Sequence, residues 1–88
     1  MKIKRHKLFI KDFRKSQPSD GQFEKFIQFI NCLRENASLP KESKDHALNG
    51  EYSDCREFHL GGDTLVIYLS TSTEVTLLRL GSHSQLFR

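Results

Sequence analysis

The chain has 88 residues, a net charge of +3, and 36% hydrophobic and 28% charged residues. This balance is that of an ordinary globular protein, and it excludes a wholly disordered chain or a fibrous repeat. The length predicts a single domain over residues 1–88, with a small core that depends on a few large side chains. The longest apolar run, residues 65–69, is far shorter than the roughly 20 residues of a membrane helix. We therefore expect no membrane partner.

The N-terminus and the cysteines bear on the compartment. The chain is charged from Lys2 onward and lacks the apolar stretch and cleavage site of a secretory signal. Cys32 and Cys55 lie far apart and form no Cys-x-x-Cys pattern, so we expect reduced thiols rather than a disulfide or a zinc site. Together these features predict a cytoplasmic protein.

Positive charge is concentrated at the start of the chain. Residues 1–15 carry seven basic residues and one acid, residues 16–60 carry five basic and eight acidic residues, and residues 61–88 are balanced. A basic segment on a nearly neutral domain predicts a polyanion or an acidic protein as partner, the alternative being a merely soluble surface. The seven basic residues are Lys2, Lys4, Arg5, Lys7, Lys11, Arg14 and Lys15.

The first half of the chain predicts one strand and two helices. Residues 2–6 alternate in the manner of a charged edge strand. From Lys7 the apolar residues are spaced by three and four, which indicates a short helix that ends before Pro18. Ser19 begins a capping-box pattern, and apolar positions then continue at helical spacing. This predicts a second helix over residues 20–36.

The second half changes to a period of two. It predicts strands over residues 52–60, 65–70 and 74–80, the first two joined by a tight turn at Gly61-Gly62. In the last strand, simple alternation places Arg79 on the same side as Leu77. The order is one strand, two helices and a three-stranded antiparallel meander. We expect an α+β sandwich with both helices on one face of the sheet.

Pairing within this meander gathers four polar side chains near one end of the sheet: His59, Asp63, Arg79 and His83. Two imidazoles can accept and donate protons near neutral pH, and an arginine can stabilise a phosphoryl group that gains charge. These four residues fit a reaction in which RNA is cleaved by attack of its own 2′-hydroxyl group. A base takes the hydroxyl proton, the oxygen attacks phosphorus, and an acid protonates the departing 5′-oxygen. Whether the loop around His46 reaches this end does not follow from spacing.

Several of these residues have simpler interpretations. His6 is expected to be exposed and without a role, and Asp63 beside two glycines is also a common turn residue. Arg79 in an apolar strand must lie at an edge, be paired or be functional. A metal site at His59, Asp63 and His83 is chemically reasonable, but no recognised ligand spacing supports it. We therefore expect no metal and no cofactor.

Four motifs carry a family resemblance. Residues 44–50 with Tyr52, residues 56–59, Asp63 with residues 65–68, and residues 78–87 resemble, in order and spacing, the YafQ branch of the RelE/ParE toxin superfamily. That branch is the toxin half of bacterial type II toxin–antitoxin pairs. The resemblance implies the same sandwich fold and an mRNA endoribonuclease, without metal, that acts on translating ribosomes. It also implies silencing by a small antitoxin that binds operator DNA.

The resemblance also implies which residues act, and it is what brings His46 into the site. His46 or His59 would be the base, with Asp63 orienting or assisting it. Arg79 would stabilise the transition state and His83 would be the general acid. The active positions implied in this sequence are His46, His59, Asp63, Arg79, His83 and Phe87.

Phe87 would stack on a base near the scissile phosphate. Ribosomal RNA would be contacted by the seven basic residues of the N-terminal segment together with Lys44 and Arg56. The chain departs from the branch at Gly62, Thr64 and Phe58, which bears on codon preference and local packing. The rival functions are a non-cleaving ParE-like gyrase inhibitor or binding module on the same fold, and a small metal-dependent hydrolase. The ordered set of His, Asp and Arg side chains favours the nuclease.

Overall fold

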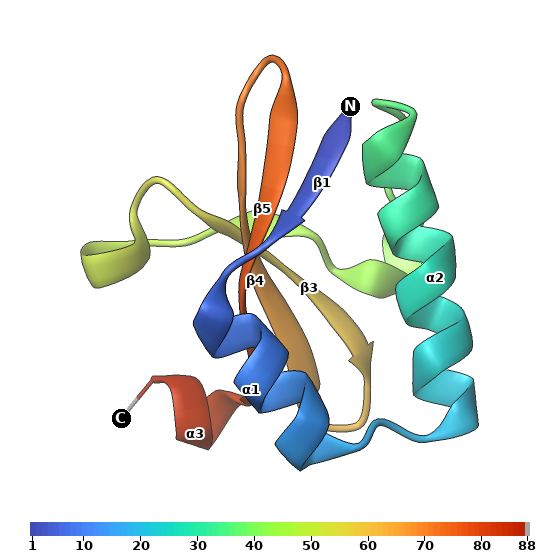
Figure 1. Cartoon of the computed structure of the whole chain (residues 1–88), viewed down its shortest axis with the longest axis vertical. Coiled ribbons are helices and arrows are strands. Elements are labelled where there is room, and N and C mark those ends of the chain that lie inside the picture. Colours follow the sequence, from blue (N-terminus) through green and yellow to red (C-terminus); the bar gives the residue numbers. More distant parts are fainter. Residues whose placement is uncertain (88) are drawn as a thin grey trace.

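In the computed structural model, which describes residues 1–87, the chain folds into an α+β sandwich on a five-stranded sheet (Figure 1). The strand order is β1-β5-β4-β3-β2, with β1 parallel to β5 and the other neighbours antiparallel. The predicted α+β fold is confirmed. The strands are β1 (Lys2–Arg5), β2 (His46–Ala47), β3 (Arg56–Gly61), β4 (Thr64–Ser70) and β5 (Glu74–Ser82). The helices are α1 (Lys7–Ser16), α2 (Asp20–Arg34) and α3 (His83–Leu86), with 3₁₀ turns at Lys41–Ser43 and Gly50–Tyr52.

Local capping explains where α1 and α2 begin. His6 is half-buried, and its Nδ1 accepts a hydrogen bond from the Leu8 amide at 3.1 Å, so it caps α1 and is not the idle exposed residue expected. The capping box predicted at Ser19 is present, with both reciprocal bonds to Gln22 formed. α2 ends two residues earlier than predicted. The left-handed backbone conformation at Asn36 (φ 56°) prevents the helix from continuing.

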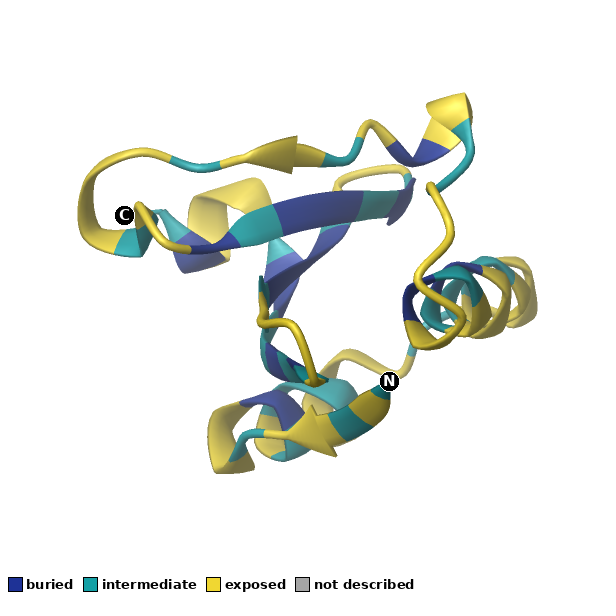
Figure 2. Cartoon of the chain, turned by 90° about the horizontal axis from the view of Figure 1, so that it is seen from above, coloured by how far each residue is buried: buried dark blue, intermediate teal, exposed yellow. Residues whose placement is uncertain are grey.

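The main core lies between the two long helices and one face of the sheet. α1 packs on β5 and α2 packs on β3, so both helices are on the predicted common face. Phe29 of α2 and Phe58 of β3 are fully buried and meet edge to face at a centroid distance of 5.5 Å. Figure 2 shows the burial concentrated along the sheet and on the inner side of α2.

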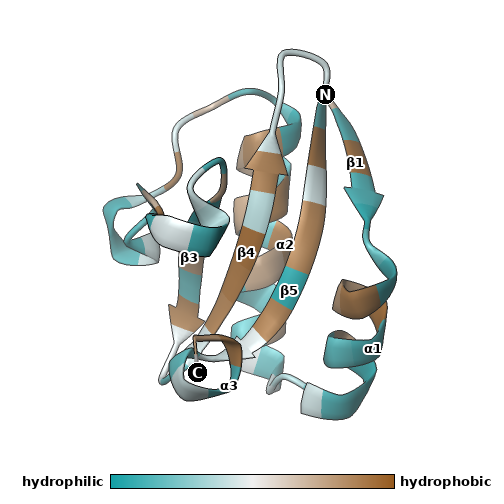
Figure 3. Cartoon of the chain, turned by 90° about the vertical axis from the view of Figure 1, so that its left-hand side faces the viewer, coloured by the Kyte–Doolittle hydropathy of each residue, from teal (hydrophilic) through white to brown (hydrophobic). Residues whose placement is uncertain are grey.

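The opposite face is covered by elements that the sequence pattern did not reveal. Figure 3 looks onto this face, with α3 in front of the sheet and α2 behind it. The prediction of a strand starting at residue 52 is wrong, because Tyr52 lies in a 3₁₀ turn after Gly50 (φ +68°) and β3 starts only at Arg56. The Tyr52 ring packs on this second face of the sheet, beside Phe87. The buried residues of this smaller cluster are Cys55, Leu65, Ile67 and Leu86.

The two cysteines are free thiols, and burial raises the pKa of Cys55. Such a thiol is less nucleophilic at neutral pH, and it packs as a small apolar side chain. Among the described residues no helix has both the length and the apolar character to cross a membrane.

The main core should control stability. Phe58→Ala is expected to lower the free energy of unfolding by about 3–5 kcal/mol, because it removes a fully buried ring and leaves a cavity. Phe23→Ala is the matched control, since that ring is 45% exposed and should cost far less. Urea unfolding followed by circular dichroism measures both. Equal losses for the two variants would contradict this description of the core.

Candidate active site

Two histidines meet around a buried carboxylate at the β2–β3 edge of the sheet. His46 Nε2 lies 3.0 Å from Glu57 Oε1, and His59 Nε2 lies 3.5 Å from Glu57 Oε2. The imidazole rings are stacked, with centroids 6.2 Å apart. Glu57 is 3% exposed, and its Oε2 has no hydrogen-bond partner within residues 1–87. A buried oxygen without a partner is costly, so its position between two imidazoles marks a site for a proton, a hydroxyl or a cation.

The position of His46 depends on the residue before it. The Asp45 carboxylate accepts hydrogen bonds from the Arg56 guanidinium at 3.0 and 3.3 Å and from the Tyr68 hydroxyl. Tyr68 belongs to the main core on the helix side, and successive residues of a strand point to opposite faces. Anchoring Asp45 on the helix side therefore directs His46 to the other face, beside Glu57. The hydrogen bond to Asp45 raises the pKa of Arg56, and burial raises the pKa of Tyr68, so both of these side chains stay protonated at neutral pH.

Strand register brings an arginine into the same row. His46 pairs with Glu57, Glu57 with Ile67, and Ile67 with Arg79, so these four residues cross the sheet in line. The expectation that Arg79 shares a face with Leu77 is wrong. Leu78 is the extra residue of a β-bulge, and the bulge turns Arg79 to the face opposite the main core.

Asp12 of α1 holds Arg79 at the edge of β5, beyond the end of β1. Its Oδ2 accepts from Arg79 Nε at 2.7 Å and from the Leu80 amide at 3.0 Å, and its Oδ1 accepts from Arg79 Nη2 at 3.2 Å. This two-point contact fixes the guanidinium plane. Hydrogen bonding to Asp12 raises the pKa of Arg79, with a smaller contribution from Tyr52, so the charge is permanent at neutral pH. The side chain is still 28% exposed.

α3 places an imidazole and an aromatic ring over this face. A capping box between Ser82 and Gln85 starts the helix immediately after β5. The start is tight, because a Cβ added to Gly81 would lie 2.9 Å from Gln85 Oε1. His83 is exposed in the first turn, and its ring centroid is 4.7 Å from that of Phe87. Phe87 in turn meets the edge of Tyr52 at 5.8 Å, and Tyr52 lies next to Arg79.

Asp63 is exposed in the turn between β3 and β4 and makes no side-chain hydrogen bond within residues 1–87. It lies at the same end of the sheet as His83, since Thr64 pairs with Ser82. The carboxylate that contacts the two imidazoles is therefore Glu57 and not Asp63. Thr64, one of the departures from the family pattern, accepts a hydrogen bond from the Gln22 side chain at 3.2 Å.

The basic residues divide into two regions. All seven of the N-terminal segment are exposed on β1 and α1, at the opposite edge of the sheet from His46. Lys4 is paired with Glu74 at 3.7 Å. Lys44 is exposed in the loop before β2, whereas Arg56 is engaged by Asp45 on the helix side of the sheet. Arg56 therefore contributes to positioning the loop and lies on the other face from Glu57.

Sequence reasoning missed three residues of this arrangement. Glu57 stood within a family motif, and its place two residues before His59 in an alternating strand was the available signal. Tyr52 also stood within the motifs but was assigned to a strand. Asp12 gave no local signal, because its partner Arg79 is 67 residues away.

The pair of imidazoles and Glu57 could also hold a cation. Ligand atoms of His46, Glu57 and His59 all lie within 4.8 Å of one another. Imidazole nitrogen and carboxylate oxygen are ligands that Zn²⁺, Cu²⁺ and Ni²⁺ accept, and the unpartnered Glu57 Oε2 fits such a role. This set differs from the one weighed from the sequence, since it contains His46 and Glu57 in place of Asp63 and His83.

Comparison with known proteins identifies the class. The family model described as "Bacterial toxin of type II toxin-antitoxin system, YafQ" matches residues 1–88. A relative named "Putative toxin YafQ" from Haemophilus influenzae is 34% identical over 97% of this chain and 90% of its own length. The "mRNA interferase toxin YafQ" of Escherichia coli K12 is 30% identical over 90% of this chain and 87% of its own length.

Solved structures agree. A copper-bound mutant toxin from Helicobacter pylori has a TM-score of 0.84 and 38% identity over 99% of each chain. The E. coli DinJ–YafQ toxin–antitoxin complex contains a chain with a TM-score of 0.81 and 27% identity, covering 98% of this chain and 96% of that one. The protein is thus a type II toxin of the RelE-like fold, and it belongs to the YafQ family.

The contact between Asp12 and Arg79 can be tested directly. Asp12→Ala is expected to lower the free energy of unfolding by about 1–3 kcal/mol, because it leaves the Leu80 amide and the guanidinium without their acceptor. Hydrogen exchange at the Leu80 amide should also become faster. Asp12→Asn should keep most of that protection, since its amide oxygen still accepts from Leu80. If the Leu80 amide of Asp12→Ala exchanged as slowly as that of the wild type, the Asp12 contact would contribute little to stability.

Proposed function

We propose that this chain is the toxin of a type II toxin–antitoxin pair and cleaves mRNA by attack of a ribose 2′-hydroxyl on the adjacent phosphorus. The observation that carries this proposal is the buried Glu57 between two imidazoles, on the same sheet face as Arg79. A surface used only for binding has no need of a buried carboxylate in contact with two proton-transfer groups. The related E. coli protein named as an mRNA interferase supports the same reaction.

The base belongs to the imidazole pair. Glu57 lies 3.0 Å from His46 Nε2 and 3.5 Å from His59 Nε2, so it orients both rings and stabilises the imidazolium that forms when one of them takes the hydroxyl proton. The orienting role expected for Asp63 is therefore assigned to Glu57. Asp63, exposed at the same end of the sheet as His83, keeps the assisting role in proton transfer.

Arg79 and α3 complete the reaction. The guanidinium, fixed by Asp12 and permanently charged, stabilises the phosphorane as negative charge builds on its oxygens. His83 protonates the departing 5′-oxygen. Phe87 lies against His83 and Tyr52, and it stacks on a base next to the scissile bond, a contact worth about 1–3 kcal/mol.

Binding to the ribosome and to the antitoxin is part of the proposal. The exposed basic residues of β1 and α1, with Lys44, add a salt-sensitive and sequence-independent attraction to ribosomal RNA. The DinJ–YafQ complex supports a cognate antitoxin for this chain, and contact with operator DNA would occur only through that antitoxin. The site of action is the cytoplasm, where translating ribosomes lie.

The first test concerns the general acid. His83→Ala is expected to lower the rate of message cleavage in a translation reaction by about 100-fold or more, because a positioned acid contributes 10²–10⁴-fold. Ser84→Ala is the matched control, as it alters the exposed neighbour in the same helix. Cleaved ends should carry 2′,3′-cyclic phosphates.

Full activity in His83→Ala would remove that residue from the mechanism. Absence of cleavage by the wild type, together with growth arrest on expression, would instead favour the ParE-like binding function.

The second test concerns metal. We propose that cleavage needs no metal, and that a transition-metal ion at His46, Glu57 and His59 inhibits because it occupies the imidazole nitrogens needed for proton transfer. The copper-bound relative makes Cu²⁺ the ion to use. Cleavage should persist in a chelator and fall on adding Cu²⁺.

Calorimetry of Cu²⁺ binding provides a readout that is independent of RNA. Glu57→Gln should weaken binding by at least about tenfold, because the variant loses the anionic ligand. Loss of cleavage in the chelator would support the metal-dependent hydrolase instead.

A further inference from the structure

A polar pocket lies between α1 and the start of α3, at the end of the sheet where β5 leads into α3. Figures 1 and 3 show both helices at this end of the sheet. The pocket has a volume of about 470 Å³, within the range of roughly 300–1,000 Å³ that is common for small-molecule sites. We call it the α1–α3 pocket. Its polar lining includes Lys15, Ser16, Thr64, Arg79, Ser82 and Gln85.

The lining groups that remain free in this pocket are hydrogen-bond donors. Gln85 Oε1 already accepts from the Ser82 amide at 2.9 Å, and Thr64 Oγ1 already accepts from the Gln22 side chain at 3.2 Å. The side-chain NH₂ group of Gln85 and the hydroxyl hydrogen of Thr64 have no acceptor within residues 1–87. The pocket therefore fits a ligand that brings several acceptor oxygens.

The charge of the pocket favours an anion. Among the described residues that line it, Asp12 alone is acidic, and both of its carboxylate oxygens accept from Arg79. Lys15 is exposed and forms no ion pair within residues 1–87. Its charge attracts an anion without fixing a geometry, whereas the amide and hydroxyl donors are directional. A phosphate group joined to a polar base meets both requirements.

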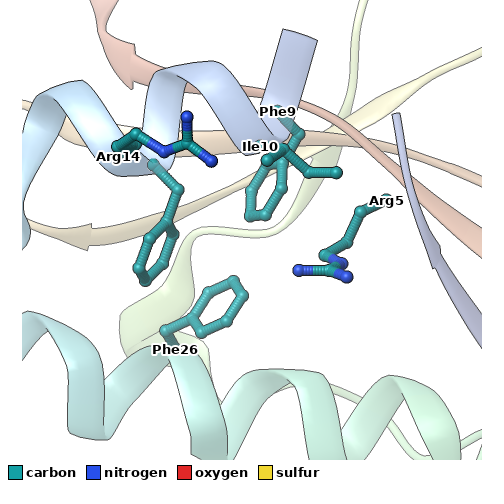
Figure 4. Close-up of a pocket in the computed structure, with 6 residues that line it drawn as sticks. Arg5, Phe9, Ile10, Arg14 and Phe26 are labelled. Atoms are coloured by element: carbon teal, nitrogen blue, oxygen red, sulfur yellow. The ribbon is translucent and has the colours of Figure 1, made fainter. Parts of the chain in front are cut away.

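A second cavity beside α1, between α1 and α2, has a different character. Figure 4 shows the rings of Phe9 and Phe26 around it, with Arg5 and Arg14 at its margin. This cavity is smaller, at about 280 Å³, and most of its wall is aromatic or aliphatic carbon. It also lies on the helix side of the sheet, away from the imidazole pair. Of these two cavities, the α1–α3 pocket is the one that suits a nucleotide.

The α1–α3 pocket adjoins the reacting groups on one side only. Arg79 lines the pocket and also ends the row that begins with His46 and Glu57, so the imidazole pair lies beyond the guanidinium. Ser82 lines the pocket and is followed directly by His83. In the proposed reaction the base acts on the nucleotide that carries the 2′-hydroxyl, and His83 protonates the 5′-oxygen of the next nucleotide. That next nucleotide therefore leaves on the side of α3, where the pocket lies.

We propose that the α1–α3 pocket binds the nucleotide on the 3′ side of the scissile phosphate. The Gln85 amide and the Thr64 hydroxyl donate to acceptor oxygens of its base. The inference deepens the proposed function and rests on it for the direction of the RNA. A nucleotide held here places the leaving 5′-oxygen in line with the attacking oxygen, so the pocket positions the substrate and takes no part in proton transfer. The base that stacks on Phe87 is then the one on the 5′ side.

The test uses two RNA fragments that the chain cannot cleave. One is a uridine dinucleotide with a 2′-O-methyl group on its first ribose, and the other is the same methylated uridine with a terminal 3′-phosphate. Uracil is suitable because its carbonyl oxygens accept hydrogen bonds. Each fragment is titrated into the whole isotope-labelled chain, and NMR follows the backbone amides and the Gln85 side-chain amide. We expect only the dinucleotide to shift the signals of Ser16 and Gln85.

Gln85→Glu separates the pocket from the start of α3. The new carboxylate still accepts from the Ser82 amide, so the capping box is kept, but a negative charge replaces the donor. Dinucleotide binding should weaken by at least about tenfold, because that charge faces the phosphate. The affinity for the 3′-phosphate fragment should stay nearly unchanged. Ser84→Glu is the matched control, since it adds the same charge to α3 at an exposed position outside the pocket lining.

A second position tests the hydroxyl donor. Thr64→Val removes the hydroxyl at nearly constant volume and should weaken dinucleotide binding by about two- to tenfold, the contribution of one hydrogen bond. Thr64→Ser keeps a hydroxyl and should bind like the wild type. Thr64→Val also loses the contact with Gln22, so circular dichroism and hydrogen exchange at the Ser82 amide establish that each variant is folded.

Equal shifts of Ser16 and Gln85 with both fragments would show that the pocket binds phosphate alone, and would overturn the inference. A dinucleotide that shifts no signal of the pocket, or that binds Gln85→Glu as tightly as the wild type, would overturn it as well. None of these measurements depends on cleavage. A chain that binds the dinucleotide in the pocket but leaves message intact would contradict the proposed function alone. A chain that cleaves message while the dinucleotide shifts no pocket signal would contradict the α1–α3 pocket alone.

Discussion

The arrangement of the site depends on the buried carboxylate of Glu57. Burying a charged group costs free energy unless neighbouring groups compensate, and the compensation here comes from two imidazoles on β2 and β3. One of them, His46, belongs to a strand of only two residues that could not stand alone. That strand is held in place by Glu57 on one face and by the Asp45 contacts on the other. The buried Glu57 carboxylate needs these contacts, and it therefore fixes the loop that carries His46, a candidate base.

The two faces of the sheet have different tasks. The helix side contains the large aromatic core and supplies most of the buried apolar area, while the other side has a smaller cluster surrounded by polar groups. Because strand residues alternate between faces, each strand contributes to both. The bulge at Leu78 interrupts this alternation in β5. Without it, Arg79 would lie against the main core.

Regular periodicity and strong local signals were enough to predict the order of the main elements from sequence. The capping box at Ser19 and the stop at Pro18 are local interactions, and they located α2 well at its start. β2 and α3 were missed because both are short and are stabilised by contacts with distant residues rather than by their own pattern. At the site, the family resemblance supplied His46. Asp12 was not predictable, because only the folded chain brings α1 against the end of β5.

The parallel pairing of β1 with β5 has a consequence for synthesis of the protein. Residues 2–5 are made long before their partners, residues 74–77. Contacts between such distant segments form late in folding, because the closure entropy of the intervening chain must be overcome first. The sheet edge and the Asp12 contact to Arg79 are therefore completed only after β5 has left the ribosome. A nascent chain that still lacks β5 therefore has neither the partner strand of β1 nor the arginine that Asp12 fixes.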